Sequence, residues 1–423
     1  MEDKLLLFCL GMENEGSKAA TLARWTDQEW NELIRQSARH GVSAYLYHRL
    51  KALDLTSPIP PLIERRLREI TIQNASQNIR RYHELGKALN ILRDEGIHVI
   101  LLKGAYLAEA VYGNIALRRM GDVDILVKKE DLHRTVKHLF QMGFQVMDEE
   151  LTGYMERIAD TRYRILPGTK HFFDLVHPNW TVKLDVHVSL TSENSSFAVD
   201  IDGLWDRAVK SDGDGVEALA LSPVDSLLYQ CMHASFHHHF MFGLRPLCDI
   251  SETIRRCQAE LNWEDLRLRA HKWKSDKCAW LTLRFAGELL GASVPEAVLT
   301  ALKPKDIDFG LLTWAREQIF SNQRDARSLP DDLIKLWKAR RLQDKAAAVL
   351  KSIFPSRQVM AVMYPASPAS LRIYFYYPVR LKDLFLRWGR IGWRLLFHDK
   401  KIVAVVESEN REVALEQWLS SED

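Results

Sequence analysis

Two aspartates, Asp122 and Asp124, lie two positions apart in an apolar stretch that reads Gly-Asp-Val-Asp-Ile-Leu-Val. In a β-strand, residues i and i+2 point to the same face, so this stretch predicts two carboxylates side by side. Like charges repel at short range, and a divalent cation removes that cost. Hard oxygen ligands suit Mg²⁺, so the spacing predicts a metal site and, with it, phosphate chemistry.

A third carboxylate, Asp185, falls on the polar face of a segment in which apolar and polar residues alternate. Upstream, Lys103 and Gly104 follow the short apolar segment 97–102 and precede a helix predicted for 106–112. The start of a helix offers backbone N–H groups and the positive end of a dipole, which suit a phosphate. Three carboxylates could hold two metal ions about 4 Å apart and so orient a nucleoside triphosphate.

The elements that must position these side chains follow from the hydrophobic periodicity of the chain. The pattern of residues 1–95 is helical and includes a long helix after the Pro-rich stretch 57–61. We expect buried strands at 97–102 and 122–127 and a β-hairpin at 171–188. We divide the chain into an N-terminal helical region (1–95), an α/β core (96–215), a C-terminal helical domain (216–330) and a basic, aromatic C-terminal region (331–423).

Composition narrows the class of protein. A chain of 423 residues is long enough for two or three domains, and its net charge of +2 does not favour nucleic acid as a partner. We expect neither a signal peptide nor a bilayer-spanning segment, which would need about 20 apolar residues. The five cysteines include no C-x-x-C pair, which indicates free thiols and a cytoplasmic location.

The order of strand, Lys-Gly turn, helix, Asp-x-Asp strand and distant Asp resembles the polymerase-β-like nucleotidyltransferase superfamily. More closely, residues ~25–300 resemble the bacterial family usually called uncharacterised nucleotidyltransferase. The motifs that carry this resemblance are Leu102-Lys-Gly-Ala105, Tyr112, Arg118-Arg-Met-Gly-Asp-Val-Asp-Ile-Leu-Val127, Leu184-Asp-Val-His187, Met232-His-Ala234 and Arg245-Pro-Leu-Cys-Asp249.

The resemblance implies an α+β fold whose core is a small mixed β-sheet, the polymerase-β-like palm, flanked by N-terminal and C-terminal helical regions. It implies that Asp122, Asp124 and Asp185 are catalytic metal ligands, and that Asp185 also helps to activate the acceptor hydroxyl. It implies Mg²⁺, with Mn²⁺ as the alternative, and a nucleoside triphosphate, most simply ATP, as the substrate.

Lys103, Gly104 and Arg118 are candidates for contacts with the nucleotide phosphates. The superfamily's usual Gly-Ser is Lys-Gly-Ala here, so the hydroxyl that often touches phosphate is absent and Lys103 could replace it as a point charge. Both cations have a simpler interpretation as solvated side chains at the ends of strands and loops.

Four further residues are candidates for supporting roles. His187 shares a face with the third acid, so we expect it to hydrogen-bond and orient that acid. His233 and His237 are one helical turn apart, and we favour a polar helix face or cleft lining over a zinc site. Arg245 and Asp249, spaced i and i+4, could pair on a helix or face the nucleotide.

The segment 372–401 is basic and contains Trp388 and Trp393. It could form a membrane-surface helix or contact nucleic acid. We favour a basic amphipathic helix packed on its own domain, because aromatic side chains are more often core than binding surface.

Our first hypothesis is transfer of a nucleoside monophosphate, most simply AMP, to a hydroxyl of a small molecule, peptide or protein. An alternative uses the same metal site to move the γ-phosphoryl group to a peptide or small molecule, as a kinase does. A third hypothesis is a non-catalytic nucleotide-binding scaffold, but a scaffold has no need of the three carboxylates of Asp122, Asp124 and Asp185.

Overall fold

The chain forms two compact units, which comprise Met1–Met147, Ala159–Asn322 and Leu419–Asp423 in one and Asp148–Ile158 and Gln323–Trp418 in the other. The computed structural model describes residues 3–11, 15–53, 59–146, 175–177, 183–192, 195–213, 216–321, 370–384 and 400–421, and single residues or short stretches between 350 and 364. The predicted turn at residues 178–179 lies outside these ranges.

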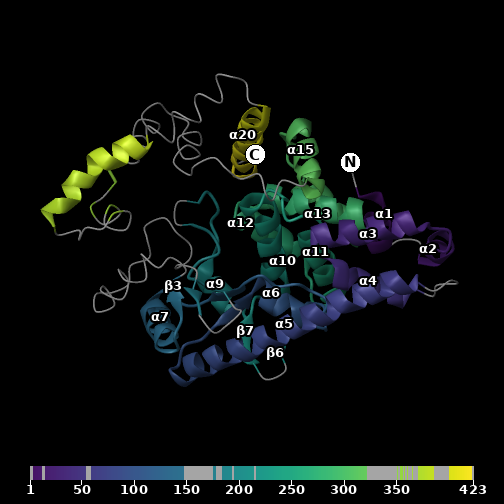
Figure 1. The fold of residues 1–423 in the computed structure, drawn as a ribbon, viewed down its shortest axis with the longest axis horizontal. Coiled ribbons are helices and arrows are strands. Elements are labelled where there is room, and N and C mark those ends of the chain that lie inside the picture. Colours follow the sequence, from purple (N-terminus) through teal and green to yellow (C-terminus); the bar gives the residue numbers. More distant parts are fainter. Residues whose placement is uncertain are drawn as a thin grey trace. The chain divides into compact units, whose positions relative to one another are not determined.

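The N-terminal part of the first unit is helical (Figure 1). Helix α3 begins with a capping box between Thr26 and Glu29 and ends at Gly41, whose φ of 67° is left-handed. Helix α5 packs against strand β7 of the sheet. The helices here are α1 (Lys4–Leu10), α2 (Glu15–Leu22), α3 (Asp27–His40), α4 (Ser43–Ala52) and α5 (Pro61–Asp94).

Seven strands of the described chain form one mixed sheet in the order β3-β4-β5-β2-β1-β7-β6. Strand β2 pairs antiparallel with β1 and parallel with β5, and β1 also pairs parallel with β7. The strands are β1 (Ile100–Leu102), β2 (Val123–Leu126), β3 (Gln145–Val146), β4 (Leu175–Val176), β5 (Lys183–His187), β6 (Val209–Gly213) and β7 (Val216–Ala220). A mixed sheet surrounded by helices confirms the predicted α+β class.

Two local features differ from the sequence expectation. Strand β2 begins at Val123, so Asp122 lies just before the strand. The helix after β1 begins at Lys103, earlier than predicted, as α6 (Lys103–Tyr106) and continues as a π-helix, η1 (Leu107–Val111). Such π-helical turns are often found at functional sites.

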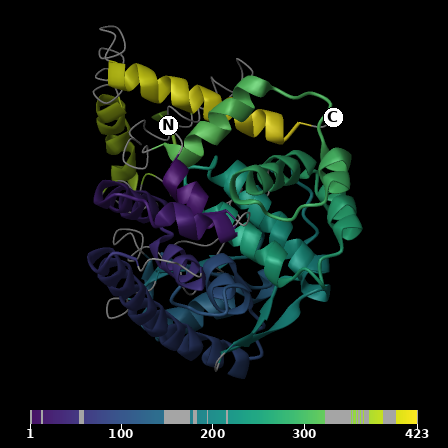
Figure 2. The ribbon, with the colours of Figure 1, turned by 90° about the vertical axis from the view of Figure 1, so that its right-hand side faces the viewer.

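The region after the sheet is a second group of helices, which lies beside the N-terminal helices (Figure 2). Ser222 caps α10 by accepting a hydrogen bond from the Asp225 amide, as its Ser-Pro-x-Asp pattern predicts. The helices between the strands are η2 (Lys129–Asp131), α7 (Leu132–Gln141) and α9 (Ile201–Asp206). The helices after the sheet are α10 (Pro223–Met232), η3 (His233–His237), α11 (Arg245–Arg256), α12 (Trp263–Lys272), α13 (Asp276–Leu290), α14 (Glu296–Leu302) and α15 (Phe309–Phe320).

The second unit contains the 3₁₀-helix η5 (Leu371–Phe375) and most of α20 (Lys400–Leu419). Trp388 and Trp393 of the basic segment lie outside the described residues. Across the described part of the chain, every helix is too short or too polar to cross a bilayer.

Candidate functional site

The pairing of three strands brings two of the three predicted acids together. Asp124 of β2 lies opposite Asp185 of the parallel strand β5, and opposite Leu102 at the end of β1. Directly opposed residues on neighbouring strands share a face, and His187 follows Asp185 by two positions. Asp124, Asp185 and His187 therefore point to the same side of the sheet.

The polar atoms of these side chains are in direct contact. Nε2 of His187 lies 2.9 Å from Oδ1 of Asp124 and 3.2 Å from Oδ2 of Asp185. The Nζ of Lys103 lies 2.6 Å from the same Oδ1 of Asp124. One ligand atom from each of Asp124, Asp185 and His187 lies within 4.8 Å of the others, the one such group found among the described residues. We call these three residues the acid group.

Burial and charge set the protonation of the acid group. Asp124 is 3% exposed, and burial alone would raise its pKa. The charge of Lys103 and the hydrogen bond from His187 outweigh burial and lower the pKa of Asp124 to about 2. Burial would lower the pKa of His187, but its contacts with Asp124 and Asp185 raise it above the ordinary value. Lys103 and His187 thus favour the ionised form of Asp124.

From the alternation of polar and apolar residues in its strand, we expected the His187 side chain to face solvent. That expectation is wrong. Its side chain is 1% exposed, because it contacts Asp124 of the neighbouring strand. Its proximity to Asp185, which motivated the prediction of an orienting role, is present as a direct 3.2 Å contact.

Asp122 lies outside the acid group and is exposed to solvent. Partial desolvation raises the pKa of Asp122, and the charge of Asp124 raises it further. The two carboxylates therefore interact as like charges, as their spacing predicts, although only Asp124 is within the strand. A role of Asp122 as a metal ligand stays a prediction.

Lys103 turns the chain from β1 into α6 with a left-handed φ of 43°, which is uncommon for a residue with a side chain. Its amino group lies 5.8 Å from the centre of the Tyr229 ring as well as against Asp124. Burial alone would lower the pKa of Lys103, but Tyr229 and Asp124 raise it above the ordinary value. Lys103 therefore compensates the charge of Asp124, and its predicted phosphate contact stays a prediction.

Gly104 makes room for Arg118. A Cβ added at Gly104 would lie 2.6 Å from Nη1 of Arg118 and 3.2 Å from Cγ of Met120. The Arg118 guanidinium donates to both carboxylate oxygens of Asp249, at 2.9 and 2.8 Å, and the Tyr112 hydroxyl donates to the same acid at 2.9 Å. Arg118, predicted as a phosphate contact, is thus held by an internal carboxylate.

The remaining predicted residues lie in the helices after the sheet. Asp249 pairs with Arg118 and not with Arg245, the partner considered from their i, i+4 spacing. The Arg245 guanidinium lies 5.5 Å from the centre of the Phe242 ring. Nε2 of His233, in the π-helix η3, lies 3.0 Å from Nε2 of His238.

Two side chains near the acids carried no recognised sequence signal. Tyr229 is 1% exposed and lies against Lys103. Arg81 of α5 is 9% exposed, and its charge interacts with that of Asp122. A polar residue on the buried stripe of a long helix, in line with Asn74 and Asn78, is the signal that could have identified Arg81.

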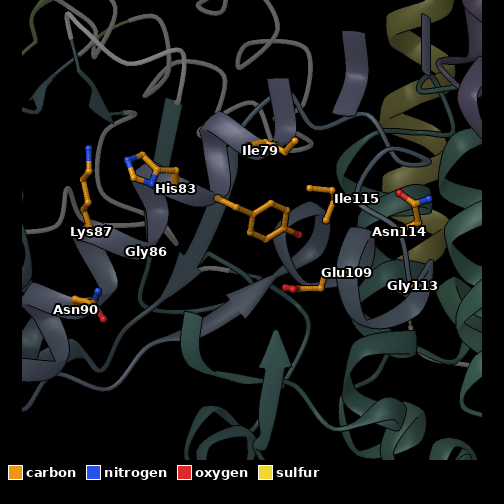
Figure 3. Close-up of a pocket in the computed structure, with 10 residues that line it drawn as sticks. Ile79, His83, Gly86, Lys87, Asn90, Glu109, Gly113, Asn114 and Ile115 are labelled. Atoms are coloured by element: carbon orange, nitrogen blue, oxygen red, sulfur yellow. The ribbon is translucent and has the colours of Figure 1, made fainter. Parts of the chain in front are cut away.

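A cavity of about 620 Å³ lies between α5 and the turn after η1 (Figure 3). Its lining includes His83 and Lys87 of α5 and Glu109 of η1. None of the acid group lines it, so cavity size alone does not identify the chemical site.

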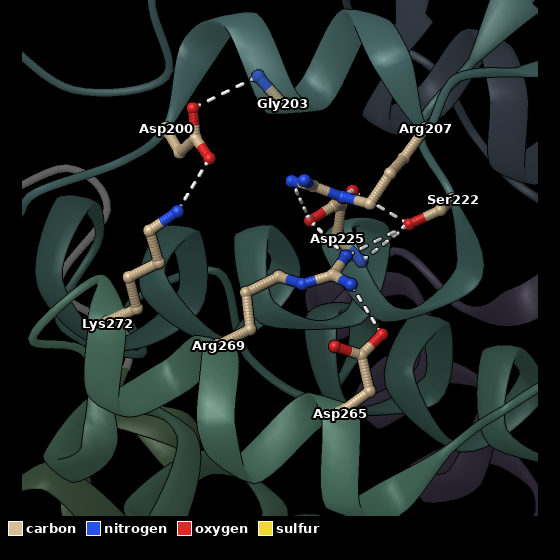
Figure 4. A network of polar contacts seen from close by, with 8 residues as sticks. All are labelled: Asp200, Gly203, Arg207, Ser222, Asp225, Asp265, Arg269 and Lys272. Carbon is tan, nitrogen blue, oxygen red and sulfur yellow. Dashed lines mark hydrogen bonds and ion pairs between the residues drawn. The ribbon is translucent and has the colours of Figure 1, made fainter.

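A second buried carboxylate, Asp225, forms a different network (Figure 4). Its side chain is fully buried and accepts from Arg207 at 3.0 Å, from Arg269 at 2.6 Å and from the Ser222 hydroxyl at 2.7 Å. This network links α10 to Arg207, at the C-terminal end of α9, and to Arg269 of α12, which also pairs with Asp265.

The comparisons with known proteins give one match. The family model described as "Uncharacterised nucleotidyltransferase" matches residues 26–291, which is more than half of the chain. Neither the curated proteins nor the solved structures contain a match. The matched residues include Lys103, which directly follows β1, and the strands β2 and β5, which carry Asp124, Asp185 and His187. The chain therefore belongs to the uncharacterised nucleotidyltransferase family.

Proposed function

We propose that this protein is a Mg²⁺-dependent nucleotidyltransferase that transfers a nucleoside monophosphate, most simply AMP, from a nucleoside triphosphate to a hydroxyl acceptor. The observation that carries the proposal is the acid group on adjacent parallel strands, in a chain of a nucleotidyltransferase family. The strand, Lys-Gly turn, helix and Asp-x-Asp order also supports a polymerase-β-like palm as the core.

The donor set of the acid group suits a divalent cation. Two carboxylates and an imidazole converge within 4.8 Å, and carboxylate oxygens favour Mg²⁺ or Mn²⁺. Asp124 and Asp185 would hold the ion, with Asp122 at the exposed edge as a further oxygen ligand. Such an ion orients a triphosphate and stabilises the charge that develops on the leaving pyrophosphate.

The chain's own side chains have separate tasks in this proposal. Lys103 keeps the buried Asp124 ionised and fixes its position through the 2.6 Å contact. His187 bridges Asp124 and Asp185 and so sets the distance between the two carboxylates. The Asp185 side chain is 13% exposed, which leaves it able to accept the proton of an acceptor hydroxyl. We place this reaction in the cytoplasm, where the five free, buried cysteines stay reduced.

The test is incubation of the protein with cell extract, Mg²⁺ or Mn²⁺, and ATP labelled in either the α- or the γ-phosphate. We expect only the α label to reach an acceptor, and we expect the Asp185→Asn variant to lose that transfer. Asp202→Asn, which removes an exposed carboxylate of α9, is the matched control and keeps it.

Three outcomes separate the hypotheses. Transfer of the γ label alone would replace the proposal by the kinase alternative. Absence of any transfer, together with nucleotide binding that Asp185→Asn leaves unchanged, would favour the scaffold. Equal loss of transfer in both variants would show that general charge, and not the acid group, is responsible.

A further inference from the structure

Arg81 is an unusual buried cation. Its side chain is 9% exposed, and its Nε is inaccessible to solvent and has no hydrogen-bond partner. The hydrogen bond from Nη1 to Oδ1 of Asn78, at 3.1 Å, is the one that its guanidinium makes to the described residues. A guanidinium carries five N–H donors, and buried arginines are normally paired with carboxylates.

Other buried arginines of this protein follow that rule. Arg118, whose side chain is 10% exposed, makes two hydrogen bonds to Asp249. Arg269, at 11%, pairs with Asp225 and Asp265. Arg81, by contrast, forms no ion pair with any described residue, so its buried charge needs another explanation.

Hydrogen bonds hold the part of helix α5 that carries Arg81 against the chain segment that leads to Asp122. Asn78 donates to the carbonyl oxygens of Ile115 and Arg118, at 2.6 and 2.8 Å, in the segment that leads to Asp122. One residue after Arg81, the Tyr82 hydroxyl donates to the Ala105 carbonyl at 2.6 Å. These bonds attach the helix to Ala105, just after the Lys-Gly turn, and to the segment 115–118 that precedes Asp122, so the backbone that carries Arg81 is held in place.

The charges around Arg81 are unbalanced. Burial lowers the pKa of its guanidinium, the nearby Arg119 lowers it as well, and Asp122 raises it. Two cations therefore share the neighbourhood of one carboxylate, and that carboxylate also interacts with Asp124. An anion placed here would satisfy the unused N–H donors of the guanidinium and compensate its charge.

We propose that Arg81 binds the polyphosphate chain of the nucleoside triphosphate, at the Asp122 end of the acid group. The inference rests on the proposed function, because it takes the anion to be that substrate. A planar guanidinium donates two parallel hydrogen bonds to phosphate oxygens, which a metal ion alone does not supply. The β- and γ-phosphates carry most of the charge, so they lie toward Arg81 and leave the α-phosphate toward Asp124 and Asp185.

The test is calorimetric titration of the full chain with ATP, and separately with inorganic tripolyphosphate, both with Mg²⁺. The variants are Arg81→Gln and Arg81→Lys, and Arg80→Gln is the control, because it removes an exposed arginine one position away on the same helix. We expect Arg81→Gln to weaken both ligands by at least about tenfold, Arg81→Lys to weaken them less, and the control to match wild type.

A second readout separates binding from a structural role. Because Arg81 has no internal carboxylate partner, the melting temperature of nucleotide-free Arg81→Gln should stay within about 2 °C of wild type. Unchanged ATP affinity in Arg81→Gln, or equal weakening in the control, would overturn the inference. If Arg81→Gln does not fold, the Arg81→Lys variant decides. Weaker ATP binding by folded Arg81→Lys supports the inference, and any other result assigns Arg81 a structural role. Wild-type protein that binds neither ligand would instead refute the proposed function.

Discussion

Asp225 and Asp124 are both buried carboxylates in contact with cations, yet their surroundings differ. Asp225 is enclosed by Arg207, Arg269 and Ser222, so each of its oxygens has a partner of opposite charge or a hydroxyl. Asp124 also has a cationic partner, Lys103, but two more acids, Asp122 and Asp185, interact with the same small region. The Asp225 site is balanced, whereas the Asp124 site gathers three carboxylates.

That difference is the one expected between a site that stabilises the fold and a site that, as we propose, binds a cation. A balanced buried ion network resists loss of any member, since each removal leaves a buried charge unpaired. Neighbouring carboxylates are costly without a cation, and the charge of Asp124 adds to the burial that raises the pKa of Asp122. Arg81 is the complementary case, a cation without an acid, and lies near the same carboxylate.

The largest expected effect is on catalysis, from Asp124→Asn. We expect transfer from α-labelled ATP to fall by about a thousandfold, which corresponds to about 4 kcal/mol of transition-state stabilisation. The melting temperature should change little, because Asp122 and Asp185 remain to compensate the charges of Lys103 and His187. A large loss of stability in Asp124→Asn would show that Asp122 and Asp185 do not replace Asp124 as partners of the two cations.

The opposite result is expected for Asp225→Asn. Its loss leaves Arg207 and Arg269 facing a neutral group, so the free energy of unfolding should fall by about 3 kcal/mol. The transfer of the α label per folded molecule of Asp225→Asn should be unchanged. Asp265→Asn is the control: Asp265 is 42% exposed, and its loss should cost about 0–1 kcal/mol in urea unfolding. Equal losses of unfolding free energy in Asp225→Asn and Asp265→Asn would show that the buried Asp225 network does not stabilise the fold more than an exposed ion pair.

A steric change tests the balanced pair that adjoins the acid group. Gly104→Ala places a Cβ 2.6 Å from Nη1 of Arg118, so it should displace that guanidinium from Asp249 and cost about 1–3 kcal/mol of unfolding free energy. Gly121→Ala, where nothing lies within 4 Å of the added Cβ, should change stability by less than about 0.5 kcal/mol. If chemical denaturation gives similar unfolding free energies for Gly104→Ala and Gly121→Ala, the Arg118 side chain moves aside without cost.

The smallest effect concerns a third buried carboxylate, Asp3. Burial alone would raise its pKa, but hydrogen bonds from His40 and Arg39 outweigh burial and hold the pKa below its usual value of 3.8. Such a carboxylate adds stability above its unfolded pKa, and this stability is lost as the pH falls through the lower folded pKa. Urea midpoints of wild type and Asp3→Asn should therefore converge as the pH falls below 3.8. Parallel curves would show that Asp3 has no such role.

Much of the site could be predicted because strand alternation is a local property. The spacing of Asp122, Asp124 and Asp185 placed two of the three acids on one face of paired strands. The mixed sheet within an α+β fold followed from the same periodicity and from the family resemblance.

What sequence could not predict depends on contacts between distant segments. The Arg118–Asp249 pair joins residues 131 positions apart, whereas spacing on one helix suggested Arg245 as the partner. The burial of His187 and the pairing of Lys103 with Asp124 depend on how three strands align. The strand β7, which extends the sheet beside β1, had no pattern strong enough to predict it.

The strand order also determines at what point of chain synthesis the acid group can form. Asp124 and His187 are 63 residues apart, and β1 gains its second neighbour only when Ala220 arrives. On a ribosome the chain emerges from its N-terminus, so a nascent chain holds β1 and β2 with open edges before their partners appear. We expect the unfinished chain to lack the acid group until β5 has emerged, and to keep an open edge at β1 until β7 pairs with it.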